Sequence, residues 1–235
     1  MPVVHRHVEV ADVAEAIAAE RQEVAARLGT TGKAMSGQAV DVLVEMCGNS
    51  LSRALDELEK LVIYVGDQPQ IRESDVRTIV LPSREWNVFH MVDAITSGNV
   101  GEALRQLRIL VGSSRKAEDA AFSQIIPQVS RALRLLWQGR VCVDAGASPG
   151  NAPDSVRALF PERPNLASES PYRQSAVMNT ARRVTLQRVE RAMAILSDTD
   201  ARLKGALDAF TPLETLERMV LEMAEVLSPR PAGRG

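Results

Sequence analysis

The stretch GNSLSRALDELEKLVIYVG, residues 48–66, decides the fold. Its leucines recur at intervals of three and four residues, which places them along one face of an α-helix. Ser50 stands where a helix-capping residue is expected, and Gly66 is a typical helix-ending residue. The stretch therefore predicts an amphipathic helix. The leucines of this stripe are Leu51, Leu55, Leu58 and Leu61.

Helical patterns continue on the N-terminal side and shortly after this stretch. Apolar residues recur with a helical period over residues 10–28 and 39–48. A short helix at 73–80 is ended by Pro82, because proline cannot continue the backbone hydrogen bonds. The first nine residues favour one short strand. We therefore expect a remnant strand or linker at 1–9 and a small helical domain at 10–82.

A second helical region follows a boundary at residues 82–86. Two helices, 86–96 and 101–111, are joined by a turn of sequence SGN. A longer helix at 117–140 contains Pro127, which must kink or split it. Thr185 is positioned to cap a helix that runs to residue 204, and the sequence TPLE at 211–214 combines a cap, a first-turn proline and a capping-box glutamate. These patterns predict a helical bundle over residues 86–227.

Residues 144–171 are rich in proline, glycine, serine and asparagine. This composition predicts a surface loop interrupted by one short helix at 154–160, with a new helix starting at Pro171. The tail at 228–235 has no apolar period, and we expect it to be disordered.

The composition supports an all-α fold. Hydrophobic residues make up 45% of the chain and aromatic residues only 3%, which favours helices packed by aliphatic side chains. The formal net charge is -2, but residues 1–82 carry 8 basic and 13 acidic side chains, whereas residues 83–235 carry 20 and 17. The near-neutral total argues against strong nonspecific nucleic-acid binding.

Cysteine usage and hydropathy point to a cytoplasmic protein. Cys47 and Cys142 are far apart in sequence and show no ligand-like spacing, as is typical of proteins from a reducing compartment. The longest apolar runs are far shorter than the roughly 20 residues that a membrane helix needs.

Motifs for catalysis, cofactors and metals are weak. Gly29–Ala34, GTTGKA, resembles a phosphate loop only in its glycines and lysine, so an interhelical turn is the better interpretation. His5 and His7 could share a metal ion on a strand, but a metal site needs three or four ligands. We therefore expect no catalytic residue, no cofactor and no metal.

Arginines form two possible basic helix faces. The residues that could contact phosphate are Arg131, Arg134, Arg182 and Arg183. Solvated faces paired with neighbouring acids are the simpler interpretation. A freestanding helical nucleic-acid-binding module that uses these faces remains an alternative function.

The order of these elements resembles the delta subunit of the bacterial DNA polymerase III clamp loader. The most specific similarity is the family pattern GN-x-L-x-R-x-L-x-ELEKL at residues 48–61, and a late D-x-x-L-K signature is similar to residues 200–204. The residues that match the family motifs are Gly48, Asn49, Leu51, Arg53, Leu55, Glu57, Leu58, Leu61, Leu203 and Lys204.

The resemblance implies a small helical lid domain of the AAA+ type followed by a helical collar domain. It implies an assembly subunit that does not hydrolyse ATP, within a DNA-directed DNA polymerase holoenzyme that loads the sliding clamp onto primed DNA. The implied partners are gamma/tau-type motor and delta-prime-type subunits, DNA within the assembly, and the sliding clamp only if an N-terminal domain exists in the full protein.

A collar packs helices from neighbouring subunits side by side, which requires apolar faces beyond those used in its own core. The candidates for such an interface are Leu133, Leu136, Trp137, Leu213, Leu216 and Met219.

Overall fold

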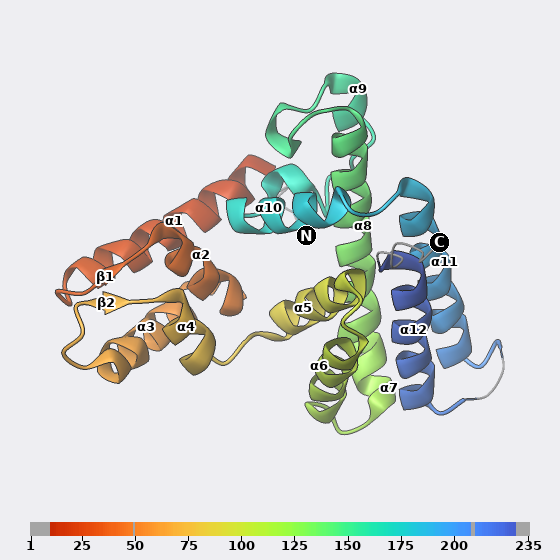
Figure 1. Cartoon of the computed structure of the whole chain (residues 1–235), viewed down its shortest axis with the longest axis horizontal. Coiled ribbons are helices and arrows are strands. Elements are labelled where there is room, and N and C mark those ends of the chain that lie inside the picture. The colour runs from red at the N-terminus through yellow and green to blue at the C-terminus, as the bar shows by residue number, and fades with distance from the viewer. Residues whose placement is uncertain (1–9, 49, 208–209, 229–235) are drawn as a thin grey trace, which may run out of the picture. The chain divides into compact units, whose positions relative to one another are not determined.

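The computed structural model describes residues 10–48, 50–207 and 210–228. Within these ranges the regular secondary structure is helical apart from a two-residue parallel pairing of β1 (Ala34–Met35) with β2 (Gln70–Ile71) (Figure 1). This arrangement confirms the predicted all-α fold class. The strand expected at 1–9 and the tail beyond residue 228 lie outside the described residues.

The chain divides into two compact units. Unit 1 comprises residues up to Ser83 together with the later segment Ala167–Gln174, and unit 2 comprises Arg84–Leu166 and the residues from Ser175 onward. The sequence suggested a boundary at 82–86, but nothing in it suggested that residues 167–174 join the first unit.

Unit 1 is built from four helices around the strand pair. They are α1 (Val10–Gly29), α2 (Gly37–Met46), α3 (Leu51–Val65) and α4 (Glu73–Ile79). Helix α3 is the helix predicted from the leucine stripe, and it turns Leu58 and Leu61 fully inward while Leu51 and Leu55 are half-buried. Ser50 occupies the N-cap position, but its side chain makes no capping hydrogen bond.

Unit 2 is a bundle of five long helices with shorter elements between them. The long helices are α5 (Arg84–Ser97), α6 (Val100–Gly112), α8 (Ile126–Asp144), α11 (Leu186–Leu203) and α12 (Pro212–Leu227). The short elements are α7 (Ala117–Ala120), the π-helical turn η1 (Ala121–Ile125), the 3-10 turn η2 (Pro149–Asn151) and α9 (Asp154–Arg157). The 3-10 turn η3 (Leu166–Ser168) begins in unit 2 and continues into the residues of unit 1. Helix α10 (Pro171–Ala181) starts in the residues of unit 1 and ends in those of unit 2.

The long helices of unit 2 enclose an aliphatic core. Helix α5 packs on α6, and α11 packs on both α8 and α12 (Figure 1). Thr185 and Thr211 cap α11 and α12 as predicted, and Thr211 forms the expected capping box with Glu214. Pro127 lies in the first turn of α8, directly after the π-helical turn. The proline does not split the segment, because residues 117–144 stay helical and change from α to π geometry and back.

The prediction of a surface loop over residues 144–171 was wrong at its C-terminal end. Leu166 is completely buried, and the amide of the buried Gln138 on α8 donates to the Pro164 carbonyl at 2.7 Å and accepts from the Leu166 N–H at 2.7 Å. The apolar side chain and this two-sided hydrogen bond fix the loop on α8, although its composition is that of an exposed segment.

Candidate functional site

Four of the six predicted interface residues are core residues of unit 2, which corrects their assignment. Leu133 and Leu136 on α8 are 1% and 3% exposed, and Leu216 and Met219 on α12 are fully buried. They belong to one hydrophobic cluster together with side chains from α5, α6 and α11. Their apolar spacing reflects packing within the chain and leaves no surface for a partner.

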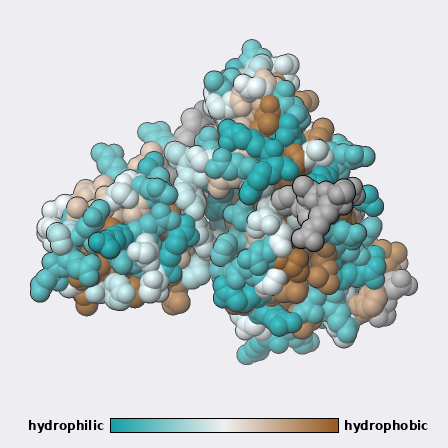
Figure 2. All heavy atoms as spheres, viewed as in Figure 1, coloured by the Kyte–Doolittle hydropathy of each residue, from teal (hydrophilic) through white to brown (hydrophobic). Residues whose placement is uncertain are grey.

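The other two predicted interface residues are only partly covered. Trp137 packs against the same cluster but remains half-buried, and Leu213 in the first turn of α12 is also half-buried. Larger apolar exposure occurs elsewhere in unit 2, at Ile109, Phe122 and Leu221, which are 44%, 41% and 50% exposed. In Figure 2 the visible surface is largely hydrophilic with separate apolar areas, and single exposed apolar side chains of this kind are normal on a protein surface.

Two residues of the GN-x-L-x-R motif hold the end of unit 1. Gly48 has a φ of 71°, and a Cβ on it would lie 3.1 Å from the Ser83 Cβ. The guanidinium of Arg53 donates to the Leu81 carbonyl, and the Ser83 N–H donates to the Met46 carbonyl at 2.7 Å. Both motif residues therefore position residues 81–83, where the chain leaves unit 1.

The remaining motif residues also serve the fold. Glu57 is 5% exposed and forms an ion pair with Lys60 at 2.7 Å. Leu203 is the last residue of α11, and Lys204 follows as its C-cap with an ion pair to Asp200 at 2.6 Å. Asn49 lies outside the described residues.

The GTTGK sequence forms a turn after α1. The hydroxyls of Thr30 and Thr31 donate to the carbonyls of residues 27 and 28, both at 2.7 Å. The Lys33 ammonium donates to the carbonyls of Gly66 and Gln68, the latter at 2.8 Å. Because Lys33 satisfies carbonyls at the end of α3, its role is structural, as the interhelical-turn interpretation predicted.

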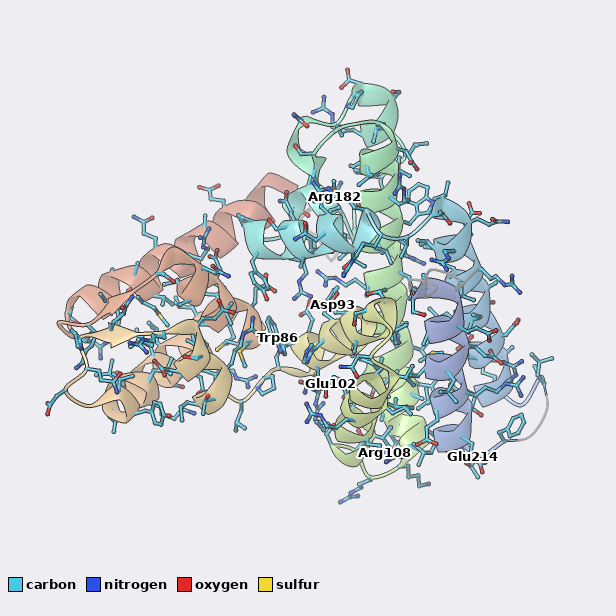
Figure 3. The ribbon with its side chains drawn as sticks, viewed as in Figure 1. Trp86, Asp93, Glu102, Arg108, Arg182 and Glu214 are labelled. Carbon is cyan, nitrogen blue, oxygen red and sulfur yellow. The ribbon has the colours of Figure 1, made fainter. Side chains whose placement is uncertain are left out.

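The predicted phosphate contacts separate into two places on unit 2. Arg131 and Arg134 line a surface pocket of about 340 Å³ on α8, together with Arg163 from the following loop. Arg182 lies just beyond α10, as labelled in Figure 3, where it donates to the Asn179 side chain at 2.8 Å. Arg183 lines a different pocket of about 350 Å³, which also includes His90 and Glu102.

The second pocket is polar but shows no arrangement for catalysis. Hydrogen bonds from Arg105 and Gln106 lower the pKa of Glu102 to about 2, so this carboxylate is a poor proton donor or acceptor near neutral pH. Glu102 stands in the first turn of α6 and Asp93 on α5, both labelled in Figure 3. His90 Nδ1 lies 3.9 Å from Glu102 Oε1.

Titratable and metal-binding groups give no further site in the described part of the chain. Burial raises the pKa of the Cys47 thiol to about 12, which keeps it protonated and unreactive. No group of three or more His, Cys, Asp or Glu side chains is arranged for a metal ion in residues 10–48, 50–207 and 210–228. His5 and His7 are outside these ranges. None of the described helices has the length and apolarity to cross a bilayer.

Sequence reasoning missed two groups of charged residues. Arg163 joins the α8 arginines only because Gln138 anchors the loop that follows it. Arg173 is 5% exposed and forms an ion pair with Glu45 of α2 at 2.5 Å within unit 1. Neither position carries a local sequence signal, because each depends on a contact between segments far apart in the chain.

The architecture defines a class of all-α proteins in which a small helical unit precedes a bundle of long helices. Residues 85–216 match the family DNA polymerase III delta subunit, C-terminal domain. The chain therefore belongs to the delta subunit family. The GN-x-L-x-R motif at 48–61 lies outside the matched range.

Two relatives extend the similarity over more of the chain. DNA polymerase III subunit delta of Bacillus subtilis strain 168 is 24% identical over 165 residues, which cover 70% of this chain and 46% of that protein. The structure of the Bacillus subtilis DNA clamp loader delta protein is similar with a TM-score of 0.61 at 20% identity, covering 89% of this chain and 56% of that one. The chain thus spans about half the length of the relatives that it matches.

Proposed function

We propose that this chain acts as the delta-type assembly subunit of a bacterial clamp loader, which places the sliding clamp on primed DNA during replication. Unit 1 serves as the lid, and unit 2 serves as the collar that packs against neighbouring subunits. The observation that carries the proposal is the helical bundle of unit 2, because the family match covers almost the whole of it up to the start of α12.

The outer face of α6 is the surface that we assign to a neighbouring subunit. A hollow of about 490 Å³ runs along it, and its lining residues are Gly101, Leu104, Arg105, Arg108 and Ile109. Ile109 is 44% exposed, and the two arginines are held by carboxylates of the same chain, Arg105 by Glu102 and Arg108 by Glu217. Protein interfaces combine an apolar centre with a polar rim, and arginine is enriched in them relative to the rest of the surface.

Size-exclusion chromatography with light scattering tests the proposal. The chain is mixed with the gamma/tau-type and delta-prime-type subunits of the same organism, and separately with the clamp. We expect a stable complex with the subunits. No complex under conditions in which the other subunits associate with one another would contradict the proposal.

A pair of variants tests the surface. Ile109→Glu introduces a charge into the α6 hollow, and we expect it to weaken assembly. Leu159→Glu is the matched control, because Leu159 is 55% exposed on the same unit and lies outside that hollow. Equal assembly of the two variants would place the subunit contact elsewhere on unit 2.

A further inference from the structure

We infer that unit 2 carries an anion pocket on α8 that binds a phosphate group of a nucleic-acid strand. The pocket of about 340 Å³ is lined by Pro127, Ser130, Arg131, Arg134, Arg163 and Pro164. The inference rests on the proposed function, since a clamp loader works on primed DNA. It adds the residues that contact the strand and the group that they recognise.

Arg131 is held in place at one side of the pocket. Its Nη1 lies 2.7 Å from Glu85 Oε1, and its Cζ lies 5.4 Å from the centre of the buried Phe89 ring. Both contacts come from α5, so two helices fix the guanidinium. A guanidinium that is already ordered loses little conformational entropy when it binds an anion.

Arg134 supplies positive charge without a partner of its own. It stands one helical turn after Arg131 on the same face of α8 and is exposed. Among the described residues it makes no hydrogen bond and no ion pair. Ser130 adds a hydroxyl to the same face, four residues before Arg134.

Arg163 is brought to the pocket by a buried hydrogen-bonding clamp. Gln138, which is completely buried, donates to the Pro164 carbonyl and accepts from the Leu166 N–H, both at 2.7 Å. Leu166 is inserted into a hydrophobic cluster with residues of α8 and α10. The backbone beside Arg163 is therefore fixed on α8, which makes the meeting of three arginines a feature of the fold.

Three guanidinium groups around one pocket favour a phosphate as the ligand. Glu85 pairs with Arg131, and arginine binds phosphate oxygens through pairs of parallel N–H bonds. A phosphodiester is small enough for a pocket of this volume, and the charged side chains that line the pocket are arginines, which suit the anionic backbone of a strand. The contact is therefore with the backbone and independent of sequence.

Fluorescence anisotropy with a labelled oligothymidylate of about 20 nucleotides tests the inference on the full chain. The variant is Arg134→Gln with Arg163→Gln, and the control is Arg115→Gln with Lys116→Gln, which removes the same charge from an exposed turn outside the pocket. We expect the pocket variant to bind about tenfold more weakly, at about threefold for each exposed contact. The slope of log K against log salt should fall by about 0.7, because the pocket neutralises one phosphate and each phosphate contact on a single strand contributes about 0.7.

Circular dichroism melting of each variant checks that its fold is retained. No binding by the unchanged chain at about 20 mM salt overturns the inference, and so does equal weakening by the pocket and control variants. A melting shift with pyrophosphate that the pocket variant loses, without oligonucleotide binding, would assign the pocket to a free phosphate and overturn the nucleic-acid assignment. Loader assembly is a separate readout, so failure of the pocket leaves the proposed function testable by chromatography.

Discussion

Replacing Arg173 with methionine tests whether a buried ion pair fastens residues 167–174 to the rest of unit 1. The side chains of Arg173 and Glu45 are 7% and 2% exposed, with Nη2 and Oε2 2.5 Å apart. The Ser170 hydroxyl donates to the other carboxylate oxygen and accepts from the Arg173 N–H at 3.1 Å. The three groups form one closed network inside the unit.

The expected loss of stability is large because the carboxylate stays behind. Removing one partner of a buried pair leaves an uncompensated charge and costs about 3–5 kcal/mol. Replacing both Glu45 and Arg173 with methionine removes the charge as well, and we expect a stability within about 1 kcal/mol of the unchanged chain. The exposed pair Lys204–Asp200 is the matched control, and Lys204→Met should cost about 0.5 kcal/mol or less.

Urea unfolding combined with hydrogen–deuterium exchange measures the effect. The single variant should exchange faster in peptides covering residues 167–174 and in α2, since both ends of the network lie there. The double variant should restore protection. A loss below about 1 kcal/mol for Arg173→Met, with unchanged exchange in these peptides, would refute the reasoning from burial.

Three further predictions concern unit 2. Leu133→Ala should destabilise the chain by about 2–5 kcal/mol in urea unfolding, because it opens a cavity in the core, whereas Leu221→Ala at an exposed site should change stability by about 0.5 kcal/mol or less. Gly139→Ala should cost about 1–3 kcal/mol in the same assay, since a Cβ would lie 3.0 Å from a neighbouring side chain; Gly112→Ala, with open space around it, should not destabilise. The lowered pKa of Glu102 contributes stability that is lost as pH falls from about 4.5 to about 2. In the Glu102→Gln variant the urea midpoint of unfolding should therefore depend less on pH over that range.

Local signals were sufficient for most of the helices. The caps at Thr185 and Thr211 depend on hydrogen bonds within a few residues, which the sequence displays directly. Helix α4 ends at Ile79, shortly before Pro82, which has no backbone N–H to continue it. The lysine of the GTTGK turn was also judged correctly, because the spacing of a phosphate loop is a local property. The all-α class follows from the same short-range preferences.

Long-range contacts set the limit of prediction. The apolar stripe of α8 predicts a buried face, but it does not indicate whether that face is covered by another helix of the same chain or by a partner. For this reason Leu133 and Leu136 were assigned to an interface. Arg163 stands in a stretch with loop-like composition, and Arg173 stands in the first turn of α10. Only the hydrogen bonds of Gln138 and the pairing with Glu45 give them fixed positions.

The return of residues 167–174 to unit 1 has a consequence during protein synthesis. A ribosome adds about 5–20 residues per second, so roughly 5–20 s separate the emergence of Ser83 from that of Gln174. During this interval the nascent helices α1–α4 lack the segment that supplies the partner for Glu45. A separately expressed piece of residues 10–83 would lack this segment permanently, so the Glu45 carboxylate on α2 would have no Arg173 to pair with.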